Sequence, residues 1–123
     1  MPEALPNSND TIVLLHNPKC SKSRATLALL EERDAEFSVR EYLTDPLDAA
    51  ELRDLAGRLG KPIGEWLRSG EAAFAESGLS KQASAEELIA LVASQPICMQ
   101  RPILVRGSRA VIGRPPQDVL ALL

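Results

Sequence analysis

A continuous apolar run at residues 11–15 (TIVLL), followed at once by a polar break, most limits what this chain can fold into. Such a run, with no alternation of polar residues, is typical of a central strand covered on both faces. Residues 16–19 (HNPK) indicate a loop, residues 21–33 have helical periodicity, and residues 37–43 predict a second strand. Strand, helix and strand in this order predict a right-handed unit with two parallel strands.

The rest of the chain predicts a helical insert and then a hairpin. Asp45-Pro46 ends the second strand, and the helical signals after it are an amphipathic stretch at 48–59, two short pieces within 62–78, and a capping box of Ser84 and Glu87. Residues 103–105 and 110–112 predict two short strands, with a last helix beginning at Pro115. The order predicts an α/β, thioredoxin-like fold: a four-stranded mixed sheet flanked by helices, with an all-helical insertion at about residues 49–95.

Length and composition favour one domain in a reducing compartment. The chain has 123 residues, and we expect a loose N-terminal leader at 1–10 and a single domain at 11–123. No apolar leader and no membrane-length apolar stretch occurs, so we expect a cytoplasmic protein with reduced thiols and no membrane partner. A net charge of −3 argues against a nucleic-acid partner.

Cys20 lies where the first strand passes into the first helix, in HNPKCSKSR. Unpaired N–H groups and the helix dipole favour negative charge at such a position, and Lys19, Lys22 and Arg24 act in the same direction. A thiolate is the nucleophilic form of cysteine, and the same N–H groups can hold an oxyanion. The alternative is a cysteine that only packs as a small apolar residue, which the polar, cationic flanks disfavour.

Five segments of the chain resemble the glutaredoxin-coupled arsenate reductase (ArsC) family. They are HNPKCSKSR, YLTDPLDAAEL, EWLRSGE, QPICMQRPILV and VIGRPPQDVLALL, and the resemblance covers residues 11–123. It implies that Cys20 is the nucleophile and that Arg68, Arg101 and Arg114 hold the oxyanion. Arginine suits this role because it stays protonated and offers paired, planar N–H donors. Each of the three could instead be an ordinary solvated charge.

The resemblance also implies roles around the nucleophile. His16 and Ser23 match loop positions near the thiolate: His16 could tune the thiol or only hold the loop, and the Ser23 hydroxyl could donate to the sulfur. Arg24 belongs to the same anion-binding or thiolate-tuning group. In thioredoxin-like folds a cis proline begins the third strand and faces the nucleophile, which implies a cis bond before Pro102.

The cysteine count indicates how the enzyme would be reduced. Cys98 is the only other cysteine, it is flanked by apolar residues, and we interpret it as structural. No metal-ligand spacing occurs, so we expect no metal and no bound cofactor. The resemblance then implies external reduction by glutathione, with glutaredoxin as the protein partner.

The expected function is thiol-dependent reduction of arsenate to arsenite by a monomer. Two alternatives remain open: a generic glutathione-dependent thiol oxidoreductase, and a non-catalytic redox or regulatory binding module of the same fold. A related branch binds RNA polymerase and senses redox state through a CxxC pair, but Ser23 stands where that pair needs its second cysteine. Ser21-Lys22 replaces the Gly-Thr pair frequent in the best-known reductases and resembles a sister group of the family.

Overall fold

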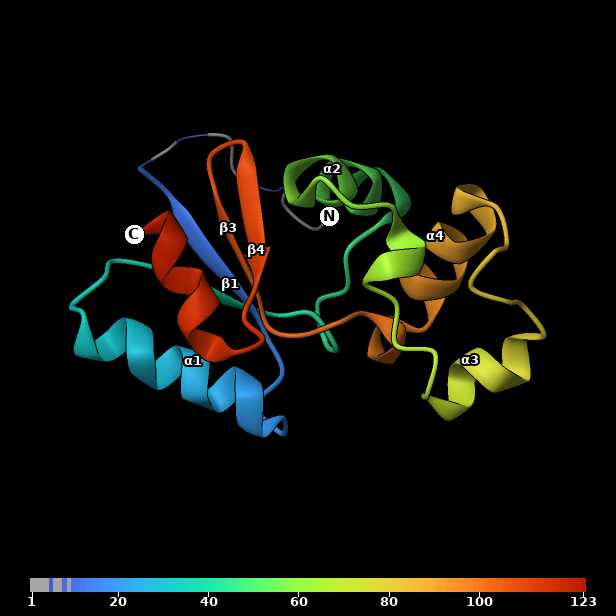
Figure 1. Cartoon of the computed structure of the whole chain (residues 1–123), viewed down its shortest axis with the longest axis horizontal. Helices are drawn as coiled ribbons and strands as arrows, with labels where there is room; N and C mark the ends of the chain where they lie inside the picture. The colour runs from blue at the N-terminus through green and yellow to red at the C-terminus, as the bar shows by residue number, and fades with distance from the viewer. Residues whose placement is uncertain (1–4, 6–7, 9) are drawn as a thin grey trace.

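Strand β1 (Ile12–His16), formed by the apolar run, lies inside a four-stranded mixed sheet with strand order β2-β1-β3-β4 (Figure 1). The computed structural model describes Leu5, Ser8 and residues 10–123. β1 pairs in parallel with β2 (Ser38–Glu41) and antiparallel with β3 (Ile103–Arg106), which pairs antiparallel with β4 (Arg109–Ile112). The predicted sheet is therefore confirmed, with a second strand shorter than expected.

Helix α1 (Ser21–Glu32) and the 3₁₀ helix η3 (Pro116–Leu122) cover one face of the sheet (Figure 1). They share a buried cluster with the two central strands, made of Ile12, Leu14, Leu30, Leu104, Val119 and Leu122. The predicted last helix is present, but it begins one residue later. Pro115 stays extended, at φ −67° and ψ 163°, as the residue that caps η3.

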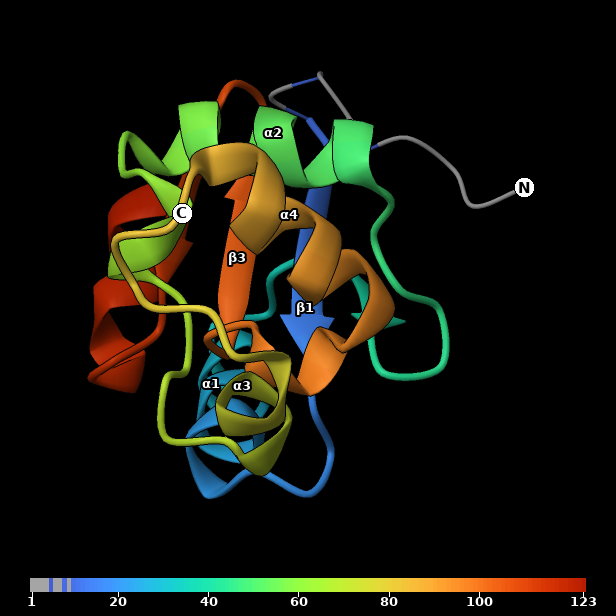
Figure 2. The ribbon, with the colours of Figure 1, turned by 90° about the vertical axis from the view of Figure 1, so that its right-hand side faces the viewer.

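The insert covers the opposite face and is entirely helical, as predicted (Figure 2). Its elements are α2 (Ala49–Leu59), η1 (Ile63–Glu65), α3 (Ala72–Ser77), α4 (Ala85–Ser94) and η2 (Pro96–Cys98). They enclose the larger buried cluster, which includes Tyr42, Leu52, Trp66 and Met99. Because η2 leads directly into β3, the insert brings its own side chains to the end of the sheet where β1 runs into α1.

Local sequence signals account for the element boundaries. Asp48 with Glu51, and Ser84 with Glu87, form complete capping boxes that begin α2 and α4. Gly60 ends α2 in the left-handed region at φ 69°. Between β3 and β4 the turn has Gly107 at φ 60°, a backbone conformation that a two-residue hairpin requires and glycine adopts readily.

A buried ion pair joins β2 to α2. Arg40 Nη1 lies 2.6 Å from Glu51 Oε2, and the two side chains are 10% and 6% exposed. Arg40 also donates to the backbone carbonyls of Asp45 and Pro46, at 3.0 and 2.9 Å. The turn that follows β2, which contains Tyr42, is thus held at both ends.

The predicted leader at 1–10 lies mostly outside the described residues and stays a prediction. Within it, Leu5 is buried in the larger cluster, and its carbonyl accepts an N–H of Arg58 at 3.4 Å. Among the described residues, every helix is too short or too polar to cross a membrane.

Candidate active site

Cys20 is the N-cap residue of α1, so its side chain lies beside the unpaired N–H groups of the first helical turn. Asn17 shapes the loop that leads to it. The backbone carbonyl of Asn17 accepts the N–H of Cys20 at 3.0 Å, and its side-chain Oδ1 accepts the N–H of Lys19 at 3.0 Å. Cys20 is partly exposed, so a substrate arriving from solvent can reach the sulfur.

The surroundings of Cys20 favour the thiolate. Burial raises the pKa of the thiol, but the backbone N–H groups of Ser23 and Lys22 and the guanidinium of Arg101 outweigh burial, and the pKa is lowered from its ordinary value. The direction agrees with the sequence prediction. The positive charge that lowers this pKa, however, is that of Arg101, which is 81 positions further along the chain than Cys20.

Ser23 and His16 hold the loop between β1 and Cys20 in place. The buried Ser23 hydroxyl lies 2.6 Å from Nδ1 of His16 and accepts the N–H of Asn17 at 3.0 Å. Burial lowers the pKa of His16, against the opposing charge of Glu41, so the ring is neutral at physiological pH. The hydroxyl of Ser23 therefore bonds to the loop, and it is the main chain of Ser23 that favours the thiolate. The sequence left two roles open for His16, tuning the thiol or holding the loop. Its contact with Ser23 is of the loop-holding kind.

The cationic flanks of Cys20 contribute less than the sequence suggested. Lys19, Lys22 and Arg24 are exposed, and the described residues give their side chains no hydrogen bond or ion pair. Arg24 meets Cys20 only through the main chain, where its N–H donates to the Cys20 carbonyl at 3.0 Å. A role for Arg24 in anion binding or thiolate tuning stays a prediction.

Arg114 is in direct contact with the Cys20 sulfur. Its Nη2 lies 3.7 Å from the Cys20 sulfur, and its Nε donates to the backbone carbonyl of Arg101 at 2.8 Å. One N–H of the guanidinium is thus used to orient the group, and another faces the thiol. This geometry provides both a counter-charge for the thiolate and a donor for an oxygen bound next to it.

Arg101 is nearly enclosed, with 12% of its side chain exposed. Its Nη1 donates to the Ile97 carbonyl at 3.4 Å and lies 3.7 Å from Glu71 Oε2. Its Nε is buried, and the part of the chain that the structure describes supplies no partner for it. Buried N–H groups are rarely left unpaired, so this Nε is a donor that a bound oxyanion could use.

Arg68 comes to the site from the insert. An isolated bridge between Leu67 and Met99, together with an Arg68 N–H to Cys98 carbonyl bond of 2.7 Å, fixes its backbone beside the start of β3. Its Nη1 donates to Gln100 Oε1 at 2.9 Å and its Nε to Glu71 Oε2 at 3.2 Å. Arg68 and Arg101 therefore share Glu71 and Gln100 as neighbours, and the three predicted arginines gather around one end of the sheet.

Two cis prolines follow two of these arginines. The peptide bonds Arg101-Pro102 and Arg114-Pro115 are both cis. The cis bond before Pro102 was predicted and is confirmed, whereas the one before Pro115 was not predicted. Gly113 lies between them, and its N–H donates to the Pro102 carbonyl at 2.9 Å. This bond joins the segment before β3 to the segment after β4. The first segment carries Arg101 and the second carries Arg114.

Three residues of this neighbourhood were missed by sequence reasoning. Gln100 accepts from both Arg68 Nη1 and the Arg101 N–H, the latter at 3.2 Å, and Glu71 contacts both guanidinium groups. Their closeness in sequence to Arg68 and Arg101 was an available signal. Tyr42, directly after β2, is fully buried, and nothing in the sequence distinguished it from an ordinary core residue.

Cys98 is 0% exposed. Burial, and after it the charge of Glu71, raises the pKa of its thiol. It has the properties of a structural cysteine.

The described part of the chain contains no group of three or more His, Cys, Asp or Glu side chains that could hold a metal ion.

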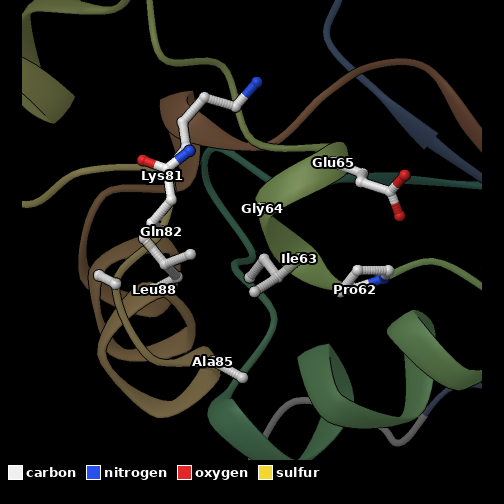
Figure 3. Close-up of a pocket in the computed structure, with 9 residues that line it drawn as sticks. Pro62, Ile63, Gly64, Glu65, Lys81, Gln82, Ala85 and Leu88 are labelled. Atoms are coloured by element: carbon white, nitrogen blue, oxygen red, sulfur yellow. The ribbon is translucent and has the colours of Figure 1, made fainter.

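A hollow of about 510 Å³ lies elsewhere, within the insert (Figure 3). Ile63, Gly64 and Leu88 line it, together with the segment around Lys81. Gly64 permits a close approach there, since a Cβ at this position would lie 2.9 Å from the Lys81 carbonyl. The hollow contains none of the thiol or arginine groups described above and is separate from the candidate active site.

A thioredoxin-like sheet with Cys20 at the N-terminus of α1, and with Arg114 in contact with its sulfur, defines the class of protein as a thioredoxin-like oxidoreductase. Within that class the chain belongs to the ArsC family, whose model matches residues 15–122. It is 37% identical to an arsenate reductase of Neisseria meningitidis, over 91% of this chain and 97% of the relative, and 44% identical to the uncharacterised Escherichia coli protein YfgD, over 91% and 96%. Among solved structures, an arsenate reductase from Vibrio cholerae matches with a TM-score of 0.87 and 40% identity, covering 92% of this chain and 98% of that one.

Proposed function

We propose that this chain is an arsenate reductase that uses Cys20 as nucleophile, Arg68, Arg101 and Arg114 as the oxyanion clamp, and glutathione with glutaredoxin as reductants. One observation carries the proposal: the Arg114 guanidinium lies 3.7 Å from a sulfur whose pKa is lowered. Thiol and guanidinium together fit a tetrahedral anion that must be bound and attacked at its centre. The relatives named as arsenate reductases support arsenate as that anion.

The first step forms a bond without a change of oxidation state. The Cys20 sulfur attacks arsenic, an arsenic–oxygen bond breaks, and dihydrogen arsenate with the thiol gives the thioarsenate ester and water. Negative charge moves among the remaining oxygens as water leaves. Arg101 and Arg114 are already oriented by backbone carbonyls, so they can stabilise this charge without reorganising.

The second step is the reduction. Glutathione attacks the Cys20 sulfur, the sulfur–arsenic electron pair stays on arsenic, and arsenic goes from the +5 to the +3 state as arsenite leaves. Cys20 and glutathione are then joined in a mixed disulfide. The glutaredoxin thiolate takes over the glutathionyl group and releases the Cys20 thiolate, and a second glutathione then attacks the mixed disulfide on glutaredoxin and leaves as glutathione disulfide. Across the cycle two glutathiones give one glutathione disulfide, and one water is formed.

An external reductant follows from the two cysteines. Cys98 is 0% exposed and its thiol pKa is raised, which suits it poorly to attack a Cys20 intermediate. The partly exposed Cys20 is accessible to glutathione. We propose that the protein works in this way as a cytoplasmic monomer, without a bound cofactor and without a nucleic-acid or membrane partner.

The two alternatives are less well supported. A disulfide substrate has no need of arginines gathered around the thiol, which disfavours a generic thiol reductase. A redox-switch module of the CxxC type needs a second cysteine where Ser23 stands, and the Ser23 hydroxyl is occupied by the loop.

The deciding experiment incubates the purified protein with arsenate, glutathione and glutaredoxin and measures arsenite directly. We expect arsenite to form, to require both reductants, and to be absent with Cys20→Ser. A matched control is Cys98→Ser, which alters the other thiol. Absence of arsenite from the folded wild-type protein would overturn the arsenate assignment. Equal turnover by Cys20→Ser would overturn the nucleophile.

A further inference from the structure

Tyr42 carries a buried hydroxyl without a hydrogen-bond partner. The residue is 0% exposed, and among the described residues no group lies in hydrogen-bonding geometry with its Oη. Within the part of the chain that the structure describes, the only other buried side-chain N or O atom without a partner is Nε of Arg101. Buried donors are almost always paired in native proteins, so two unpaired donors in one protein need an explanation.

The sheet register places Tyr42 at the active site. β1 and β2 are parallel, with His16 opposite Glu41 in their last pair. Asn17 follows His16 and Tyr42 follows Glu41, so both residues come directly after this last pair, at the edge where β1 leads to Cys20. The bonds from Arg40 to the Asp45 and Pro46 carbonyls hold the turn after β2 in place, so the position of the ring is set by the fold.

Charged groups of the candidate site influence the hydroxyl of Tyr42. Burial raises the pKa of Tyr42 to about 12, and the charges of Arg101, Cys20 and Arg68 also act on it. The amide of Asn17 is close enough to favour the ionised form, but it lies outside bonding geometry. The phenol is thus neutral at physiological pH and keeps its proton available as a hydrogen-bond donor.

We propose that the Tyr42 hydroxyl is a further binding residue, which together with Arg101 Nε donates a hydrogen bond to an oxygen of the bound oxyanion. This inference rests on the proposed function for the identity of the anion. A tetrahedral oxyanion at Cys20 presents several acceptor oxygens, and each of the two donors gains the partner that it lacks in the free protein.

Hydrogen bonding, not proton transfer, is the role that fits. A phenol held this strongly in its neutral form is a poor general acid near neutral pH. As a donor it supplies an uncharged contact to the anion, in addition to the charged contacts from the guanidinium groups. Such a contact helps to orient the anion for attack by the sulfur.

The test uses the fact that Tyr42 is the only tyrosine of the chain. Arsenate is titrated into the Cys20→Ser protein, where it binds without reacting, and the near-ultraviolet absorption of tyrosine is followed. We expect the tyrosine band to shift to longer wavelength as the anion accepts its hydrogen bond. The same titration by calorimetry on Cys20→Ser combined with Tyr42→Phe should show about tenfold weaker binding, the usual contribution of one such bond.

The matched control is Thr44→Val, which removes an exposed hydroxyl from the same turn and should leave both the affinity and the tyrosine shift unchanged. Tyr42→Phe should melt at or above the temperature of its parent, since it removes an unpaired buried group. If Tyr42→Phe fails to fold, the band shift in the tyrosine-containing protein still decides the matter.

The outcomes separate this inference from the reductase proposal. Unchanged affinity in Tyr42→Phe, or arsenate binding with no tyrosine shift, would overturn the role of Tyr42 and leave the reductase standing. Binding with the shift but no arsenite from the wild-type protein would keep Tyr42 and remove the reductase. A protein that binds no arsenate at all would remove both.

Discussion

Arg114 takes its orientation from Arg101: its Nε donates to the Arg101 carbonyl at 2.8 Å while its Nη2 lies 3.7 Å from the Cys20 sulfur. The two arginines therefore do not act as separate charges. A shift in the main chain at Arg101 moves the guanidinium that touches the nucleophile. Because residues that share partners couple energetically, the two positions should behave as one unit in mutagenesis.

Replacing either arginine should sharply reduce catalysis. We expect Arg101→Lys and Arg114→Lys to lower kcat/KM for arsenate by roughly 10²–10³, nearly as much as the alanine variants, because lysine lacks the planar paired donors. The double lysine variant should lose less than the product of the two single effects. Wild-type rates in both single alanine variants, with unchanged melting curves, would leave the clamp without support.

Arg68 should matter less. It comes from the insert, its side chain is 26% exposed against 12% for Arg101, and its bonds go to Gln100 and Glu71 and not to Cys20. Arg68→Ala should therefore raise KM more than it lowers kcat, as expected for a group that binds the anion without touching the reacting sulfur. Steady-state kinetics on arsenate give the two parameters. A fall in kcat equal to that of Arg114→Ala would contradict this order.

The thiol of Cys20 should ionise below the roughly 8.5 of a free cysteine. Its pKa is lowered because N–H groups of the helix and the charge of Arg101 outweigh burial. The rate of alkylation by iodoacetamide should rise through an inflection below that reference, and the inflection should move upward in Arg101→Ala. Since the folded state favours the thiolate, ionisation of Cys20 adds stability as the pH rises through the folded pKa, and this stability is lost on acidification.

Labelling of the two cysteines gives an internal control for that measurement. Cys98 is buried and its pKa is raised, so mass spectrometry should find the label on Cys20 first. An inflection at or above the free value, or faster labelling of Cys98, would contradict the assignment of the nucleophile.

Cys98→Ser should keep most of its turnover. Its thiol is not exposed and lies beneath the Arg68 segment, where the Cys98 carbonyl accepts the Arg68 N–H at 2.7 Å. We expect a lower melting temperature from placing a hydroxyl in an apolar site, with kcat per folded molecule close to that of the wild type. Loss of turnover in a well-folded variant, restored by added dithiol, would instead make Cys98 a resolving thiol.

The sheet and the position of Cys20 at a helix start were predictable because both depend on local signals. An apolar run, a polar loop and a cysteine at a helix start are readable from residues 11–33, and the capping boxes are visible as short motifs. Arg68, Arg101 and Arg114 could be proposed only through family resemblance, since nothing local distinguishes them from surface arginines. Their convergence depends on the bridge between Leu67 and Met99 and on the pairing of β3 with β4.

The contacts inside the site were beyond sequence reasoning because they are long-range. The counter-charge for Cys20 was assigned to Lys19, Lys22 and Arg24, and the structure supplies it from Arg101 and Arg114. The Ser23 hydroxyl was aimed at the sulfur, and it bonds instead to His16 and Asn17. Tyr42 was only one of several apolar strand residues until the register of β1 and β2 placed it next to Asn17.

Gly113 should be intolerant of any side chain. A Cβ there would lie 2.9 Å from both Thr26 Oγ1 and Pro102 Cγ, and 3.3 Å from Val119 Cγ1. These neighbours belong to α1, the proline ring and η3, none of which can move away freely. Gly113→Ala should therefore cost about 1–3 kcal/mol of unfolding free energy by overpacking. Because Gly113 precedes Arg114, kcat/KM should fall even at temperatures where the variant is fully folded.

The matched control for Gly113→Ala is Gly57→Ala on α2, where a Cβ would meet nothing within 4 Å. There alanine should be neutral or stabilise by about 0.5–1 kcal/mol, since glycine is a poor residue for a helix interior. Chemical denaturation measures both variants, and arsenate kinetics on the same samples separate stability from catalysis. Equal stability of the two variants would mean that the packing of α1, Pro102 and η3 around Gly113 is looser than the distances require. A destabilised Gly113→Ala with normal kcat/KM would mean that Arg114 is positioned by its bond to the Arg101 carbonyl alone.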